Sequence, residues 1–431
     1  KRIDQLGREF NHQAGSPIKL GSPKQLGELF FNTLGVMPTK YGKPSSKTGE
    51  VSPSVDKEVI GAWAEGDITF WDGENEVDMD EESYRLVQDL ASGLSEHRKL
   101  SKFLGTYVYG MSEWIDGNFR IHTKINQHVA VTGRISSSDP NLTNIPRRNN
   151  DKFKVRDAFI ADGGKILFVA DYAQIEMRLM AHLSGDPTMI KVIKDGVDMY
   201  SFTVSEMGMG ATYDEVRAAK KAVDNAVATA AQEIIAKLRD AAKAIGFGLI
   251  YGIGEVKLGR QLGLPVIKVV DKRGNRRDAC PEASKLISKY FGVFPDIKKF
   301  IANVHAQVER DGFVQTLLGR FRRLPAIHSP NRQLSSQARR QSVNVECQGG
   351  AADILRMAMI ACEFDPDLQA AGVEMLLQIH DELMFEVPDH EDIKVDVQQR
   401  IQHHMEHPFE QELEVPLPAE GKYAPAWGLA K

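Results

Sequence analysis

Two aspartates in this sequence lie at the ends of apolar runs that have the length and composition of buried strands. The run 166–170 leads directly into Asp171, and apolar residues flank the pair His380-Asp381 on both sides. Desolvating a lone carboxylate costs several kcal/mol, so each aspartate is expected to be paired, hydrated or bound to a metal. For Asp171 taken alone, a helix N-cap is an equally good interpretation.

If both strands share one sheet, the two carboxylates meet and repel each other unless cations lie between them. Mg²⁺ suits such a place, because it takes carboxylate oxygens together with substrate phosphates. Two metals about 3.5–4 Å apart clamp the attacking and leaving oxygens of an in-line phosphoryl transfer. The aspartate pair therefore indicates phosphoryl-transfer chemistry.

A second group of side chains recurs every fourth residue: Arg239, Lys243, Phe247 and Tyr251. On an α-helix this spacing aligns them on one face. A phosphate chain can lie along the two cations while a flat ring stacks near the aromatics. The alternative is a solvated cationic face followed by two core aromatics, and this stretch alone leaves both interpretations open.

The elements that would position these residues can be predicted from pattern and composition. The pair His380-Asp381 is expected at the turn of a hairpin. Residues 212–245 favour helix, with a break near Thr229. The acidic segment 66–83 is expected to be a solvated loop, and the Arg-rich segment 310–340 a basic patch suited to phosphate contact.

Composition narrows the class of protein. The chain has 431 residues, of which 42% are hydrophobic and 26% charged, as in an ordinary globular protein. The sequence contains no apolar run of membrane-spanning length and no signal peptide. Its three cysteines match no zinc or redox spacing, which favours a reducing compartment. The net charge of −5 argues against a uniformly basic nucleic-acid binder, although local basic surfaces remain compatible with it.

Several stretches together resemble family A DNA polymerases, the DNA polymerase I family. Residues 171–178, 239–252 and 378–386 resemble its signature motifs A, B and C. Further matches follow in the same order and spacing, at 132–146, 312–325 and 345–353. The resemblance implies an α+β fold of the right-hand polymerase type. Its parts would be a thumb at 1–106 with an acidic insertion near 66–83, a palm with an antiparallel sheet at 107–180 and 341–431, and mostly helical fingers at 181–340.

The resemblance also implies roles for individual residues. Asp171 and Asp381 would bind metal with the Tyr172 carbonyl, and Glu382 would be an accessory catalytic carboxylate. Nucleotide-binding residues would be Gln174, Glu176, Tyr200, Arg239, Lys243, Phe247 and Tyr251. Among these, Glu176 would crowd the ribose 2′ position and so reject ribonucleotides. DNA-binding residues would be Arg98, Lys102, Arg134, Asn144, Gln348 and His380.

The sequence departs from the family pattern in places. Gly246 replaces the usual polar residue before the Phe, Tyr200 stands where a His is usual, and Thr143 replaces a Gln. The segment between Tyr200 and Arg239 is longer than usual and is expected to be extra helix. The family's proofreading exonuclease domain would precede Lys1, so a polymerase-only unit is expected.

Expected cofactors are two Mg²⁺ ions, with Mn²⁺ as a substitute, and expected partners are primer–template DNA and dNTPs. A monomer inside the cell is expected, in the cytoplasm, at the nucleoid or in an organelle, with no membrane contact and any processivity factor unidentified. A single-subunit RNA polymerase is the nearest alternative, and Phe247 with Glu176 argues against it. An inactive DNA-binding accessory subunit is the other alternative, and the presence of both aspartates argues against that.

Overall fold

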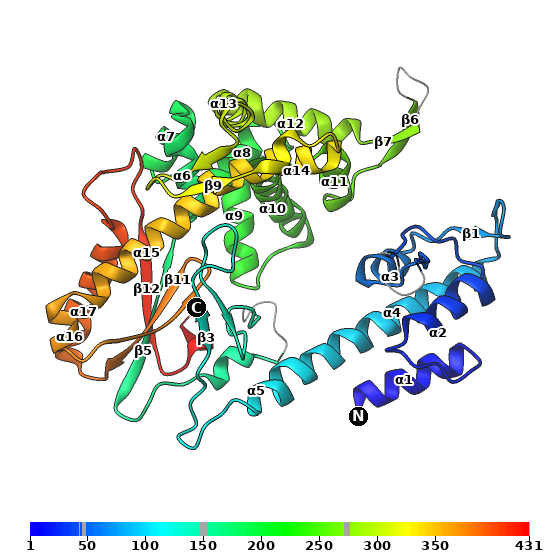
Figure 1. Ribbon diagram of the computed structural model, residues 1–431, viewed down its shortest axis with the longest axis horizontal. Helices are drawn as coiled ribbons and strands as arrows, with labels where there is room; N and C mark the ends of the chain where they lie inside the picture. Colours follow the sequence, from blue (N-terminus) through cyan, green and yellow to red (C-terminus); the bar gives the residue numbers. More distant parts are fainter. Residues whose placement is uncertain (43, 45–48, 147–152, 271–275, 431) are drawn as a thin grey trace. The chain divides into compact units, whose positions relative to one another are not determined.

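The computed structural model describes residues 1–42, 44, 49–146, 153–270 and 276–430 (Figure 1). The chain divides into two compact units, Lys1–His122 and Thr123–Lys431. Both combine helices with small antiparallel sheets, which confirms the predicted α+β class. Within the described residues, no helix is long and apolar enough to cross a membrane. The predicted thumb boundary at residue 106 falls inside the first unit, and the assignment of segments to thumb, palm and fingers stays a prediction.

The first unit is mostly helical. Its elements are α1 (Arg2–Gln13), α2 (Pro23–Gly27), a π-helical turn (Glu28–Thr33), α3 (Lys57–Ala64), β1 (Phe70–Trp71), β2 (Glu76–Val77), α4 (Glu81–Phe103), a second π-helical turn (Leu104–Tyr109) and α5 (Gly110–Ser112). Trp63 of α3 lies at the centre of the core, with the rings of Phe30 and Phe31 at centroid distances of 4.8 and 5.8 Å. Aromatic side chains of this kind bury large apolar areas and stabilise the core of this unit.

The acidic side chains of segment 66–83 are exposed, as predicted, but the segment is not the continuous loop that its composition predicted. It contains the β1–β2 hairpin and the first turn of α4, and Phe70 is buried in the core. The Asp72 carboxylate accepts two backbone N–H groups at 2.9 and 2.8 Å, which closes the hairpin turn. Asp80 accepts a backbone N–H at 2.8 Å and so caps α4. Some of the acidic side chains therefore act as hydrogen-bond acceptors in a turn and a helix cap, a role that a count of charges does not reveal.

The second unit is built on a four-stranded antiparallel sheet with the strand order β10–β11–β5–β12. These strands are β5 (Lys165–Tyr172), β10 (Glu374–Ile379), β11 (Glu382–Pro388) and β12 (Ala419–Ala424). The predicted strand before Asp171 and the predicted hairpin around Asp381 are both confirmed. Because side chains alternate along a strand, Phe168 and Tyr172 face the core while Asp171 faces the opposite side.

Two helices cover the apolar face of this sheet: α15 (Gly350–Glu363) and α17 (Glu391–Glu406) (Figure 1). Shorter elements connect and flank the sheet. They are β3 (Lys124–Asn126), β4 (Ser136–Ser138), a 3₁₀ turn (Val155–Ala158), a π-helical turn (Val345–Gly349), α16 (Pro366–Ala370) and a final 3₁₀ turn (Trp427–Leu429).

A larger helical group packs around a second core in the same unit (Figure 1). Its helices are α6 (Ile175–Ser184), α7 (Pro187–Lys194), α8 (Met199–Glu206), α9 (Tyr213–Asp224), α10 (Ala230–Ile250), α11 (Glu255–Gln261), α12 (Pro281–Val293), α13 (Pro295–Asp311) and α14 (Arg332–Asn344). Its other elements are β6 (Ile267–Val270), β7 (Arg276–Ala279), β8 (Phe313–Gln315), β9 (Phe321–Arg323) and a 3₁₀ turn (Pro325–His328).

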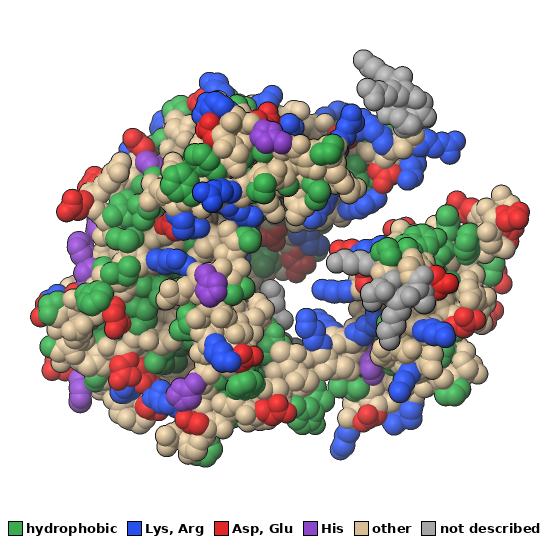
Figure 2. All heavy atoms as spheres, viewed as in Figure 1, with side chains coloured by type: hydrophobic (Ala, Val, Ile, Leu, Met, Phe, Trp, Pro, Cys, Tyr) green, Lys and Arg blue, Asp and Glu red, His purple; other side chains and the backbone are tan. Residues whose placement is uncertain are grey.

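The predicted break in the long helical stretch is confirmed. Thr212 opens α9 and Thr229 opens α10, each with a capping box in which the third helical residue bonds back to the cap. Figure 2 shows Lys and Arg side chains gathered over the edge of the helical group next to the β6–β7 hairpin. Local basic surface is therefore present on a chain that is acidic in total.

The closeness of β12 to Phe168 yields a stability prediction. A Cβ on Gly421 would lie 2.1 Å from the ring of this fully buried Phe. Gly421→Ala should therefore destabilise the protein by about 1–3 kcal/mol, the usual cost of overpacking a core. Thermal unfolding measures the loss. Gly292→Ala is the matched control, because a Cβ there meets nothing within 4 Å and helix propensity favours Ala. Equal melting temperatures for the two variants would contradict the packing described.

Candidate active site

The register of the sheet brings Asp171 and Asp381 to the same end of adjacent strands. Asp171 is the seventh of eight residues in β5 and lies directly across from Glu382, the first residue of β11. The backbone N–H of Tyr172 donates to the carbonyl of Asp381 at 3.2 Å. His380 has a φ of 57°, so the turn before Asp381 uses the left-handed region. The condition set by the sequence, that both strands share one sheet, is met.

A row of carboxylates crosses the sheet at this level. Glu420 of β12, Asp171 of β5 and Glu382 of β11 occupy one register line, and cross-strand partners share a face. Glu382 is only 2% exposed, and its Oε1 accepts the indole N–H of Trp427 at 2.7 Å. The Arg156 guanidinium lies 3.8 Å from the same oxygen and 4.0 Å from the Trp427 ring centroid. The catalytic role of Glu382 stays a prediction, since its described contacts hold it inside the protein.

One arginine links the sheet to α6. Nη2 of Arg134 donates to Oε1 of Glu176 at 2.5 Å and to Oδ1 of Asp381 at 3.1 Å. The Tyr251 hydroxyl donates to the other Glu176 oxygen, and the Gln348 side chain donates to the Tyr251 oxygen at 3.1 Å. Burial raises the pKa of the Glu176 carboxyl, against the opposing effect of its bonds from Tyr251 and Arg134. Residues predicted separately to bind nucleotide, metal and DNA therefore form one connected network.

Arg239, Lys243 and Phe247 lie on α10 and Tyr251 caps its end, so the four-residue spacing aligns them as predicted. The Phe247 and Tyr251 rings are nearly parallel, with centroids 6.4 Å apart. Lys243 is exposed, and its ammonium nitrogen lies 5.9 Å from the Phe247 centroid. Tyr200 of α8 lies beneath the two cations, with the Arg239 guanidinium carbon 5.1 Å from its ring centroid. The helix thus presents two cations and two aromatics in series, the arrangement that suits a nucleoside triphosphate.

The donor types suit a hard divalent cation, because Asp171, Tyr172 and Asp381 lie at the same end of β5 and β11 and offer carboxylate and backbone carbonyl oxygens. Across the described parts of the chain, no three His, Cys, Asp or Glu side chains form a ready cage for a metal. Mg²⁺ commonly takes one or two carboxylates and completes its shell with water and substrate phosphate. Asp171, Asp381 and the Tyr172 carbonyl are the groups that would hold it.

Comparison with known proteins agrees with this geometry. The family model described as DNA polymerase family A matches residues 1–429. The chain belongs to DNA polymerase family A. It is 35% identical over 385 residues to DNA polymerase I of Pseudomonas aeruginosa, which covers 89% of this chain and 36% of that protein. It is 34% identical over 432 residues to DNA polymerase I of Streptococcus pneumoniae, which covers 100% of this chain and 42% of that protein.

A solved structure shares the fold of this family A chain. The POL domain of Pol1 from M. smegmatis, solved in complex with DNA primer-template and dNTP, matches with a TM-score of 0.78 and 31% sequence identity. The match covers 100% of this chain and 65% of that one. The likeness confirms the predicted polymerase fold class. The chain spans about two fifths of the length of the curated relatives named above.

Sequence reasoning about the family A motifs missed Asp198. Its two carboxylate oxygens accept Nε and Nη2 of Arg239, both at 2.9 Å, so the guanidinium is held in a bidentate pair. Burial would raise the pKa of this carboxyl, but the bonds from Arg239 and Ser201 outweigh it and leave the pKa below the usual value. In the sequence, Asp198 could be recognised only as a residue that directly precedes a helical segment. It caps that helix, α8. Asp198 is thus a positioning residue for Arg239.

The remaining predicted residues lie in varied settings. Gln174 precedes α6 with a φ of 57°, and Tyr200 is 3% exposed with a hydroxyl that has no described partner. Asn144 lies in the loop after β4, where its backbone N–H donates to Asn141 Oδ1 at 3.2 Å. In the first unit, Arg98 and Lys102 belong to the last turns of α4. Arg98 donates to a backbone carbonyl at 2.7 Å and is half-buried, whereas Lys102 is exposed.

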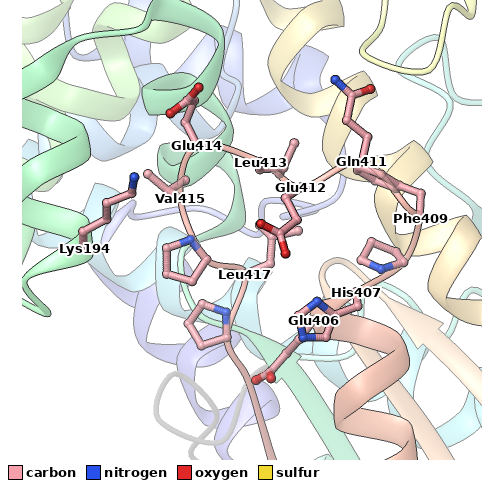
Figure 3. Close-up of a pocket in the computed structure, with 13 residues that line it drawn as sticks. Lys194, Glu406, His407, Phe409, Gln411, Glu412, Leu413, Glu414, Val415 and Leu417 are labelled. Carbon is pink, nitrogen blue, oxygen red and sulfur yellow. The ribbon is translucent and has the colours of Figure 1, made fainter.

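A separate cavity of about 410 Å³ is formed by the end of α17 and the loop 407–418 that follows it (Figure 3). Figure 3 shows that its labelled side chains come from this loop and from Glu406 at the end of α17, with Lys194 reaching toward it from the end of α7. No residue predicted for the active site lines this cavity. We therefore assign this cavity no part in the site around Arg134.

Glu346 provides a pH-dependent prediction for this part of the molecule. It lies two residues before Gln348, and burial raises the pKa of its carboxyl from 4.5 to about 7. Between these values the folded state binds more protons than the unfolded chain, so stability falls as the pH rises through the window. Glu346→Gln, which cannot ionise, should therefore melt higher than wild type at about pH 8 but not at about pH 5. Thermal unfolding at both pH values tests this, and a difference independent of pH would contradict it.

Proposed function

We propose that this chain is a template-directed DNA polymerase that adds dNTPs to a primer 3′-OH and releases pyrophosphate. The observation that carries the proposal is a continuous set of contacts from Asp381 through Arg134 and Glu176 to Tyr251. It joins the carboxylates at the end of the sheet to the cationic and aromatic face of α10. Carboxylates for metal, cations for a triphosphate and aromatics for a base therefore belong to one site.

The reaction is a nucleotidyl transfer. The primer 3′-oxygen forms a bond to the α-phosphorus, the bond from that phosphorus to the bridging oxygen breaks, and pyrophosphate leaves with the electron pair. The proton of the 3′-hydroxyl passes to water. Such a reaction depends on positioning and on stabilising charge that develops on the phosphoryl oxygens.

Residues of α10 would bind the incoming nucleotide. Lys243 is exposed and offers a point charge to phosphate, while Arg239 is pre-oriented by Asp198 and retains Nη1 for the triphosphate. Phe247 would stack against the nucleotide, and Tyr251 would lie near the templating base. Because the helix fixes their spacing, these residues lose little conformational entropy when the nucleotide binds.

Asp171 and Asp381, with the Tyr172 carbonyl, would hold two Mg²⁺ ions, for which Mn²⁺ is a substitute. When bound, such ions supply Lewis-acid stabilisation of the attacking and leaving oxygens. Arg134 already contacts Asp381, so it fixes that carboxylate at the sheet while Asp171 is fixed by its strand. These are contributions of the chain's own residues to the geometry of the transfer.

Primer–template DNA is the proposed partner, and the related POL domain from M. smegmatis was solved with primer-template and dNTP. Arg134, Asn144, Gln348 and His380 would contact DNA from the second unit. Arg98 and Lys102 would contact it from the first. A single-subunit RNA polymerase stays the alternative in principle. The family match and the buried Glu176 beside the nucleotide face favour deoxynucleotides.

Primer extension with dNTPs and Mg²⁺ on a defined template tests this function. Asp381→Ala should lower the rate of nucleotide addition about 1000-fold or more, because metal stabilisation is worth several kcal/mol and about 1.4 kcal/mol is tenfold. DNA binding, measured by fluorescence anisotropy, should survive. Asp392→Ala removes an exposed carboxylate on α17 and serves as the control that keeps full activity. Substantial extension by Asp381→Ala would sink the assignment.

Glu176 supplies a test of sugar choice. If its side chain fills the space that a 2′-OH needs, Glu176→Ala should lower the ratio of dNTP to NTP kcat/KM by about tenfold or more, equivalent to ~1.4 kcal/mol. Glu176→Gln keeps the side-chain volume and should keep most of the discrimination, which separates bulk from charge. Equal ratios in wild type and Glu176→Ala would show that Glu176 is not the gate.

A further inference from the structure

A polar cavity of about 330 Å³ lies in the second unit beside the cationic face of α10, and most of its lining, Gln174 and Asp198 apart, has no part in the function proposed above. Its walls come from the start of α6, the turn before α8, α9 and β12. They include Gln174, Arg178, Asp198, Arg217 and Glu420. The volume is many times the roughly 30 Å³ that one water occupies in the liquid, so a hydrated polyatomic anion has room there.

The position of this cavity connects it to the reaction centre on two sides. Asp198, in its wall, holds Arg239 through two hydrogen bonds of 2.9 Å. Glu420, in another wall, is the direct cross-strand partner of Asp171. A group that leaves the cations of α10 therefore finds this cavity adjacent to both the helix and the aspartate strand.

Arg178 gives the cavity its chemical character. Its Nε donates to the Ala173 carbonyl at 2.7 Å and its Nη1 to the Pro416 carbonyl at 2.9 Å, and both acceptors are neutral. Among the described residues it has no carboxylate within ion-pair distance. Burial lowers the pKa of this guanidinium, which records the cost of keeping the cation half-buried. A partly desolvated cation whose acceptors are all neutral favours a bound anion.

Two exposed side chains of opposite charge complete the lining. Arg217 projects from α9 and forms no ion pair with any described residue, so it adds a second available cation. α9 belongs to the stretch after Tyr200 that the sequence predicted to be extra helix. Glu420 is also exposed and would repel an anion. Removing the charge of Arg217 should therefore weaken anion binding, and removing the charge of Glu420 should strengthen it.

We propose that this cavity binds the pyrophosphate released by nucleotide addition, with Arg178 and Arg217 paired to its oxygens. The inference rests on the proposed function, which produces one pyrophosphate at the neighbouring site in each turnover. Pyrophosphate moves into the cavity without any covalent change. Its binding there would separate the product from the cations that must receive the next triphosphate.

Variants of Arg217 test this best, because Arg178 also ties α6 to the backbone near residue 416 and its removal would test folding. Arg217→Ala should raise the inhibition constant for inorganic pyrophosphate, and its KM in pyrophosphorolysis, by roughly two- to fivefold, as for an exposed ion pair. The KM for dNTP should change less. Glu420→Gln should shift both pyrophosphate constants the opposite way. Lys221→Ala, one turn along α9 and outside the cavity, is the matched control and should match wild type.

Three results would overturn the inference. They are unchanged pyrophosphate constants in Arg217→Ala, weaker pyrophosphate binding in Glu420→Gln, and equal rises in the constants for dNTP and pyrophosphate, which would place the substrate triphosphate in the cavity. Calorimetric titration of inorganic pyrophosphate into the DNA-free protein needs no turnover. If wild type binds pyrophosphate more tightly than Arg217→Ala but extends no primer, the proposed function fails while the binding site stands.

Discussion

The antiparallel pairing of β5 with β11 is the constraint on which the site depends. It puts Asp171 opposite Glu382 and brings Asp381 to the same end of the sheet. A slip of one residue would turn every side chain of one strand to the other face, placing the Asp171 carboxylate in the apolar core under α15 and α17 and removing Phe168 and Tyr172 from that core. The apolar face under α15 and α17 excludes that slip, because it requires Phe168, Leu383 and Phe385 inside. The hydrophobic core therefore fixes the position of the carboxylates.

The polar contacts around Arg134 position helices α6 and α10 relative to the sheet. Arg134 bridges Asp381 and Glu176, and Glu176 bonds Tyr251 at the end of α10. These residues belong to segments far apart in the sequence. Each hydrogen bond therefore restricts the position of one segment relative to the other. Glu176 is 7% exposed, and a buried carboxylate left without its partners would cost more than the bonds contribute. The network thus gives the cationic and aromatic face of α10 a defined position relative to the aspartates.

Local pattern predicted much of this arrangement. The strand before Asp171, the hairpin around Asp381 and the helix break at Thr229 all follow from short-range periodicity and capping, and all are confirmed. The bond from Trp427 to Glu382 and the pairing of Asp198 with Arg239 join residues 45 and 41 positions apart.

Contacts between residues so far apart in the sequence form only in the packed fold, and no local sequence pattern predicts them. The acidic hairpin near Asp72 was missed for a different reason. Its carboxylates act as turn and cap acceptors, a geometric role that net charge conceals. The particular function of each family residue likewise depends on neighbours that only the folded chain brings together.

The carboxylates at the end of β5 and β11 are proposed to form a metal–nucleotide site. Its most direct test is a thermal-shift titration of Mg²⁺ with a dideoxy-terminated primer–template and the next complementary dNTP. Wild type should show a saturable rise in melting temperature that grows with ligand concentration, as expected for a ligand that binds only the folded state. The double variant Asp171→Asn with Asp381→Asn should lose the Mg²⁺-dependent part of that rise. An equal rise in the double variant would contradict the account.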